Sequence, residues 1–149
     1  MALTSKPQNT VGQKIYNKNT ATGISQLMVA RARYDFSVDG GAIGLITPKF
    51  NVTIPDNAVI VGGTINSTTA FVGATATISI GTSAGSSATS ILGVTAVASY
   101  SLDARINAVP VFATPVKMTA SGVVTLTVAT APLTAGVAEI VLYYWVAGN

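Results

Sequence analysis

An unbroken alternation of apolar and polar residues in the stretch Met28–Gly41 constrains the fold more than any other feature of the chain. The even positions are all apolar: Met28, Ala30, Ala32, Tyr34, Phe36 and Val38. The odd positions from 31 onward are charged or polar: Arg31, Arg33, Asp35, Ser37 and Asp39. A period of two predicts a β-strand with one buried face. The Asp-Gly-Gly at 39–41 is typical of the turn that would follow it.

The rest of the chain repeats this plan of short apolar or alternating segments separated by turn residues. Further strands are predicted over 42–46 with 50–54, 58–65, 71–80, 111–119, 122–130 and 137–146. We expect 81–90 and 101–109 to be loops, and 91–100 to be irregular and to end in a strand. About eight short strands without a long helix predict an all-β, antiparallel β-sandwich, with a jelly roll preferred over an immunoglobulin-like sandwich.

The final strand, Val137–Val146, is apolar on both faces. One face carries Ala138, Ile140, Leu142 and Tyr144, and the other carries Val141, Tyr143 and Trp145. Such a strand belongs at the centre of a sheet or in an interface, because an exposed apolar patch of this size is unusual on a monomer. We therefore predict a homo-oligomer, a trimer before a dimer, with the face of Tyr143 and Trp145 or the adjoining strand edge near the contact. Gly62-Gly63, inside the predicted strand 58–65, indicates a bulge or a close backbone approach.

Residues 1–26 differ from the remainder and predict an extended N-terminal arm in front of a sandwich domain at 27–149. This segment is rich in polar residues and contains Lys6, Lys14 and Lys18 but no acid, so it carries the whole net charge of +3. Two interpretations stay open for it: a terminus without fixed structure, or an arm that contacts a neighbouring subunit.

Composition argues against catalysis and favours a subunit of a larger assembly. Only 9% of residues are charged, against about a quarter in a typical globular domain, so much of the surface is uncharged or covered. Without Cys or His, the chain lacks thiolate ligands, a cysteine nucleophile and the commonest general base. We expect Asp35 to pair with Arg31 or Arg33, and Asp39 to lie in a turn rather than a calcium loop. No enzyme activity, cofactor or metal is predicted.

Binding to nucleic acid or membrane is not predicted either. The glycines of the loop 81–90 lack the lysine of a phosphate-binding loop. Arg31 and Arg33 are not interleaved with aromatic residues on their own face, as a single-strand nucleic-acid platform requires. The longest apolar run, Ile140–Ala147, is too short for a membrane-spanning helix, and the N-terminus lacks the apolar core of a signal peptide.

Four stretches carry a resemblance to a known class of protein: ARYDFSVDGGAIGLITP (32–48), IPDNAVIVGG (54–63), ATATISIG (74–81) and TVATAPLTAGVAEIVLYYWV (127–146). They resemble small structural proteins of tailed bacteriophages, described as capsid decoration, cement or head-fibre-base proteins. The resemblance covers roughly residues 28–146. It implies a sandwich, made in the host cytoplasm, that binds the major capsid protein on the outer surface of the virion as an oligomer, sometimes through an N-terminal arm.

A carbohydrate- or receptor-binding β-sandwich of a tail, fibre or adhesion module is the alternative. It would use exposed aromatic residues clustered on one face, and the sequence offers few of these. The candidate partner-binding residues are Lys6, Lys14, Tyr16, Lys18, Arg31, Arg33, Tyr143 and Trp145.

Overall fold

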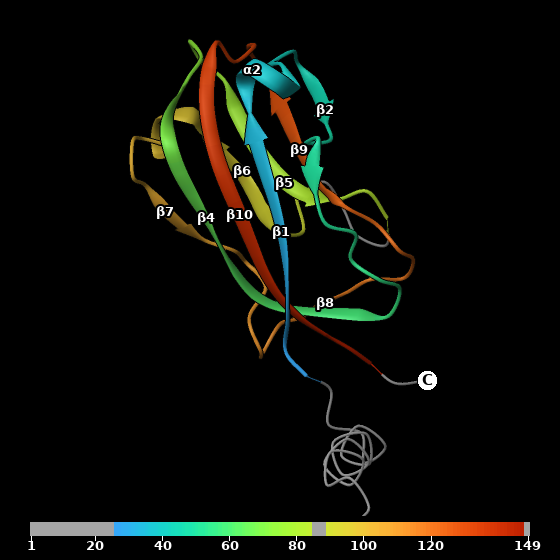
Figure 1. Ribbon diagram of the computed structural model, residues 1–149. Coiled ribbons are helices and arrows are strands. Elements are labelled where there is room, and N and C mark those ends of the chain that lie inside the picture. The colour runs from blue at the N-terminus through green and yellow to red at the C-terminus, as the bar shows by residue number, and fades with distance from the viewer. Residues whose placement is uncertain (1–25, 85–88, 148–149) are drawn as a thin grey trace, which may run out of the picture.

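Two antiparallel β-sheets pack face to face in the computed structural model, which describes residues 26–84 and 89–147 (Figure 1). The strands are β1 (Met28–Asp35), β2 (Gly44–Ile46), β3 (Phe50–Asn51), β4 (Ala58–Val72), β5 (Thr77–Thr82), β6 (Leu92–Ala96), β7 (Arg105–Asn107), β8 (Val116–Lys117), β9 (Val124–Ala129) and β10 (Ala135–Val146). A short helix, α2 (Phe36–Asp39), and a 3-10 turn, η1 (Val97–Ser99), complete the elements. Nearly all of the predicted arm lies outside the described residues.

The strand order is that of a jelly roll. One sheet has the order β3-β1-β10-β4-β7, with β8 also paired to β4, and the other has the order β2-β9-β5-β6. The pairs are nested from the ends of the chain inward: β1 with β10, β2 with β9, β4 with β7, and β5 with β6. Along these eight strands the chain alternates between the two sheets except at the β5–β6 hairpin, as in a double Greek key. The predicted all-β sandwich is confirmed.

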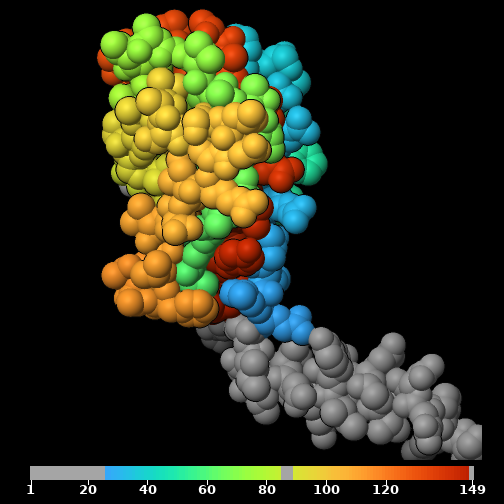
Figure 2. All heavy atoms as spheres, turned by 90° about the vertical axis from the view of Figure 1, so that its left-hand side faces the viewer, coloured from blue at the N-terminus to red at the C-terminus, as the bar shows by residue number. Residues whose placement is uncertain are grey.

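The core lies between the two sheets and is filled by the inward residues of the alternating strands. Ile78 and Ile80 of β5, Leu126 of β9, and Ile140 and Leu142 of β10 are all buried. The Tyr34 and Phe71 rings stack with centroids 5.4 Å apart, and the Tyr100 ring lies tilted against Phe71 with centroids 5.1 Å apart. The segment between β6 and β8, yellow to orange in Figure 2, covers one side of the sandwich.

β10 lies at the centre of its sheet, as the doubly apolar pattern predicted. It is hydrogen-bonded to β1 on one side and to β4 on the other. Its residues Ala138, Ile140, Leu142 and Tyr144 are buried, and they all lie on the core face.

The first predicted strand ends earlier than its alternation indicates. β1 stops at Asp35, whose carboxylate accepts hydrogen bonds from the Ser37 N–H (3.0 Å) and the Ser37 hydroxyl (2.6 Å). This is an N-cap, and it starts the helix α2. The prediction that Phe36 and Val38 continue the buried face is therefore wrong, since Phe36 is only partly buried and Val38 is exposed.

Several strand boundaries also differ from the prediction because the chain changes sheets. The predicted region 42–54 is split, since β2 pairs with β9 while β3 pairs with β1 in the opposite sheet. β4 runs on to Val72, so most of the predicted strand 71–80 is a turn followed by β5. The segment 91–100 has the reverse of the predicted order, because β6 continues the hairpin from β5 and η1 comes after it.

The structure has more strand than predicted in 101–109 and less strand than predicted in 111–119. β7 is a three-residue strand within the expected loop 101–109, and its pairing with β4 stabilises it there. In the predicted strand 111–119 only β8 pairs with a neighbouring strand, because Val111 and Thr114 bond to each other and close a tight turn.

Gly62-Gly63 marks both a bulge and a close approach, as predicted. Tyr143 pairs with Gly62 and Tyr144 pairs with Ile60, so Val61 is the extra residue on β4. A Cβ at Gly63 would overlap the backbone carbonyl of Val141 on β10. Glycine at this position is therefore required by the strand next to it.

Candidate partner-binding surface

The side of the six-stranded sheet that faces away from the four-stranded sheet, called here the outer face, collects the candidate residues that the structure describes. Figure 1 shows β1, β10 and β4 side by side with the other sheet behind them. Arg31 and Arg33 alternate with the buried Ala30, Ala32 and Tyr34 on β1, and therefore project from the outer face. On β10, Tyr143 and Trp145 project the same way, since they alternate with core residues.

A polar row crosses this face in register through five strands. It begins with the apolar Phe50 on β3 and continues with four polar residues: Arg33 on β1, Glu139 on β10, Asn66 on β4 and Arg105 on β7. These residues come from five separate parts of the chain, so no local sequence pattern could have grouped them. The row offers a partner two guanidinium groups, a carboxylate and an amide on one face of the sheet.

Asp35 pairs with Arg33, which confirms one of the two expected partners. The Arg33 Nη2 atom lies 3.5 Å from Asp35 Oδ2, and the guanidinium is half-exposed. The hydroxyl and N–H of Ser37 are the main reasons that the pKa of Asp35 is lowered, and Arg33 adds a smaller contribution. A surface pair of this kind contributes little to folding stability because water screens it, so the two groups remain available for a partner.

An aromatic patch lies next to the polar row, nearer the end of the sandwich where β10 finishes. We define it as Val29, Phe112, Tyr143 and Trp145. Val29 pairs with Tyr143 across β1 and β10, and the Tyr143 ring lies beside Gly62, which has no side chain to displace it. The rings of Phe112 and Trp145 stack with centroids 5.9 Å apart and an interplanar angle of 27°. Phe112 remains 72% exposed and Tyr143 38% exposed, which is typical of a surface that a partner covers.

Phe112 and Phe50 are surface residues that the sequence analysis did not select. Phe112 lies at the tip of the turn closed by Val111 and Thr114, in a segment predicted to be strand. The flanking Pro110 and Pro115 were a signal of that turn. Phe50 follows an alternating pattern that indicated burial, but β3 is an edge strand that turns its side chain to the outer face.

The structure thus brings together Arg31, Arg33, Tyr143 and Trp145 on one face. The other four candidates, Lys6, Lys14, Tyr16 and Lys18, lie outside the described residues.

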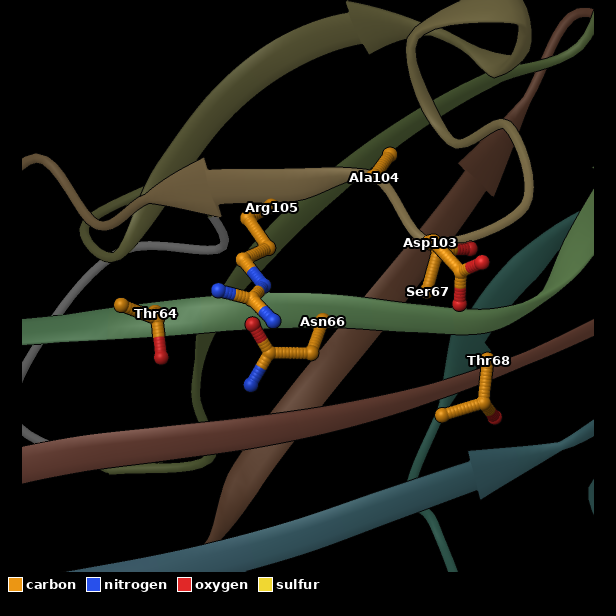
Figure 3. Close-up of a pocket in the computed structure, with 7 residues that line it drawn as sticks. All are labelled: Thr64, Asn66, Ser67, Thr68, Asp103, Ala104 and Arg105. Atoms are coloured by element: carbon orange, nitrogen blue, oxygen red, sulfur yellow. The ribbon is translucent and has the colours of Figure 1, made fainter.

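A polar hollow of about 670 Å³ opens at the Asn66–Arg105 end of the row, between β4 and the segment that leads into β7 (Figure 3). It is lined by Thr64, Asn66, Ser67, Thr68, Asp103, Ala104 and Arg105. The Arg105 side chain reaches across β4 toward Asn66, and Asp103 lies near Ser67 (Figure 3). These groups can donate and accept hydrogen bonds, but the lining contains no aromatic ring on which a sugar could stack.

Neither a metal centre nor a membrane-spanning helix is found in the part of the chain that the structure describes. Within residues 26–84 and 89–147, no three His, Cys, Asp or Glu residues lie together as a metal site would need. The described helices are all too short to cross a bilayer. Asp39, considered above for a turn or a calcium loop, accepts the backbone N–H of Asp35 and of Lys49, each at 2.9 Å.

Comparison of the sequence with protein-family models and with curated proteins gives no match. Comparison of the structure does give matches. A chain of the cyanophage Pam1 capsid asymmetric unit superposes with a TM-score of 0.60 at 18% identity, over 82% of this chain and 86% of that one. A chain of the acidic stable capsid of Helicobacter pylori bacteriophage KHP30 has a TM-score of 0.58 at 15% identity, over 83% and 90%. A chain of the capsid of Ralstonia phage GP4 has a TM-score of 0.57 at 19% identity, over 82% and 86%.

The shares covered on the two sides are similar in each comparison, so these chains are close to this one in length. At identities below 20% the likeness establishes the fold. The protein has the same jelly-roll architecture as small chains that occur in three phage capsids.

Proposed function

We propose that this chain is a structural protein of a phage virion, and more specifically a capsid decoration or cement protein. In this role it binds the outer surface of the capsid, contacts the major capsid protein and works without turnover. The main support is that chains of nearly the same length in three phage capsids share its fold over more than four-fifths of its residues. The earlier sequence resemblance points the same way.

The mechanism is stabilisation by preferential binding. A protein that binds the assembled shell, and not its separated subunits, shifts the equilibrium toward the shell by mass action. The outer face suits this role, since the aromatic patch supplies apolar area while Arg31 and Arg33 supply charge for orientation. We further propose that the chain acts as a homo-oligomer, a trimer before a dimer. The N-terminal arm would serve as a tether to the partner, with contributions from Lys6, Lys14, Tyr16 and Lys18.

Purified particles test this proposal directly. In cryo-electron microscopy of virions that contain the chain, we expect its copies to follow the capsid symmetry on the outer surface. Particles that lack it should release their genome at a lower temperature, and adding the purified protein back should restore the higher temperature. Copies found only at a tail, or particles whose heat stability is independent of the chain, would contradict the proposal.

The alternative function, carbohydrate binding, can be tested at the polar hollow. Asn66, Asp103 and Arg105 could together hydrogen-bond the hydroxyl groups of a sugar. A glycan array probed with the purified protein should show no binding if the capsid role is the correct one. Specific binding that is abolished by Asp103→Asn would favour the alternative.

A further inference from the structure

One half of β1 has a free backbone edge. β1 pairs with β10 along all of its eight residues. On its other side, β3 pairs only with Ala32 and Arg33. The last hydrogen bond on that side runs from the Val52 N–H to the Arg31 carbonyl, at 3.0 Å. In Figure 1, β1 continues well past the end of β3.

In a β-strand the backbone N–H and C=O groups of successive residues point alternately to the two sides, and this decides which groups are left without a partner. Because the Arg31 carbonyl points toward β3, the N–H and C=O of Val29, two residues away, point to the same side. Neither group has a hydrogen-bond partner among the described residues. We call Leu27–Ala30 the open edge.

The open edge is also apolar. Leu27 is 55% exposed, Val29 is 47% exposed, and Val52 beside them is 43% exposed. An apolar strand edge with free backbone groups is a template for another strand, and folded proteins usually shorten, charge or cover such edges. Most other edge strands of this protein follow that rule, since β2, β3, β7 and β8 have no more than three residues each, while β6 has five.

We propose that the open edge binds, as an added β-strand, a segment of the N-terminal arm of a second copy of this chain. The inference rests on the homo-oligomer proposed above and names the contact that joins its copies. Backbone hydrogen bonds from the incoming strand would complete the ladder, as in other cases of strand addition. The side chains of Val29 and Val52 would then be covered.

The length and position of the arm favour it as the occupant. Residues 1–25 can extend over roughly 80–90 Å, whereas β1 is only about 26 Å long. The arm joins the chain at the open half of β1. In a closed ring, each copy therefore supplies one edge and one arm of sufficient reach.

The arm sequence is suited to strand pairing. Residues 8–25 contain no Pro, so every residue there can donate a backbone hydrogen bond. Ile15 and Tyr16 are adjacent, and in a strand their side chains would project from opposite faces. We place the added strand at residues 13–18, with the Ile15 side chain next to Val29 of the aromatic patch.

Disulfide trapping tests the contact. Because the chain contains no Cys, only the introduced cysteines can form a disulfide. Ile15→Cys and Val29→Cys are made as separate full-length proteins with different affinity tags, refolded together and oxidised. We expect a disulfide between the two tagged chains, reversed by reductant. The matched control pairs Ile15→Cys with Val94→Cys, an exposed valine of the edge strand β6 in the other sheet, and should give little product.

Three outcomes would overturn the proposal. Equal trapping with Val94→Cys would show collision and not pairing. In a further protein that carries both Ile15→Cys and Val29→Cys, a disulfide formed only within single chains would show that each arm returns to its own edge. A strong disulfide between two Val29→Cys chains would show that two open edges pair directly.

A second pair of variants tests the backbone hydrogen bond itself. Val29→Pro removes the free N–H and leaves the β1–β10 bonds, since the polar groups of Val29 point away from β10. Val29→Ala keeps the N–H and shortens the side chain. By light scattering, we expect Val29→Pro to raise the dissociation constant of the oligomer about tenfold or more relative to Val29→Ala. Matching melting temperatures would show that both variants fold, and equal assembly would contradict the proposal.

The result is separable from that of the proposed function. Protein that binds capsids normally but gives no Ile15–Val29 trapping would refute strand addition alone. Protein that traps as expected but does not bind capsids would refute the capsid role alone.

Discussion

At the scale of single residues, the two faces of β10 have different roles. Leu142 is fully buried between the sheets, whereas Trp145 lies on the outer face against Phe112. Replacing Leu142 with Ala should cost about 2–5 kcal/mol of folding stability, because it leaves a cavity in the core. Replacing Trp145 with Ser should weaken assembly more than folding.

Denaturant unfolding and light scattering over a dilution series measure these two effects on the same proteins, with each variant serving as the control for the other. A stable monomer at high concentration, with Trp145 fluorescence already fully shielded, would contradict the predicted oligomer.

Tyr34 gives a pH-dependent prediction at the same scale. Its hydroxyl donates to the Gly40 carbonyl at 2.7 Å. Burial, with Asp39 and Asp35 nearby, raises the pKa of Tyr34 from 10.0 to about 12. The unfolded chain loses this proton near pH 10, so the stabilising contribution is complete below that pH and is lost as pH rises through 12.

Tyr34→Phe removes the titrating group and should lower stability at pH 7 by about 1 kcal/mol through the lost hydrogen bond. Between pH 10 and 12 its stability should fall less steeply than that of the unaltered protein. Parallel pH profiles in denaturant melts would show that Tyr34 does not control alkaline unfolding.

At the scale of elements, the close contact between β4 and β10 requires Gly63 but not its neighbour Gly62. A Cβ at Gly63 would overlap the backbone of β10, but at Gly62 it would meet only the Tyr143 ring, at 3.8 Å. Gly63→Ala should therefore destabilise the fold by about 1–3 kcal/mol, while Gly62→Ala should change stability by at most about 0.5 kcal/mol. Thermal melts compare the two variants, and similar losses in both would mean that strand propensity, and not the close approach, governs this site.

At the scale of the whole molecule, the sandwich and the arm are expected to be separable. The core strands all begin at Met28 or later, so removing residues 1–26 should leave the melting temperature nearly unchanged. The shortened protein should lose most of its binding to capsids and its ability to oligomerise. Sedimentation with purified particles measures the binding to capsids. If the shortened protein binds capsids as well as the full-length protein does, the arm is not a tether.

The sequence by itself determined that the chain is built of short strands and, for the first and last of them, which residues are buried. The alternation in β1 as far as Tyr34, and the doubly apolar β10, predicted both the core residues and the central position of the last strand. These features follow from a period of two, which is a local property of the chain. The same periodicity indicated a sandwich, because many short half-buried strands have few other ways to cover their apolar faces.

Only the tertiary structure decided which strands are neighbours and where the alternation stops. The row from Phe50 to Arg105 joins five distant segments, and Phe112 reaches Trp145 from a turn outside the sheet. α2 replaces the end of a regular strand pattern because Asp35 caps it and because Asp39 accepts the N–H of Lys49, ten residues further along the chain. A periodic pattern specifies the face of a residue but not its partner across the sheet. Partners, register and the open edge of β1 exist only after the strands have assembled.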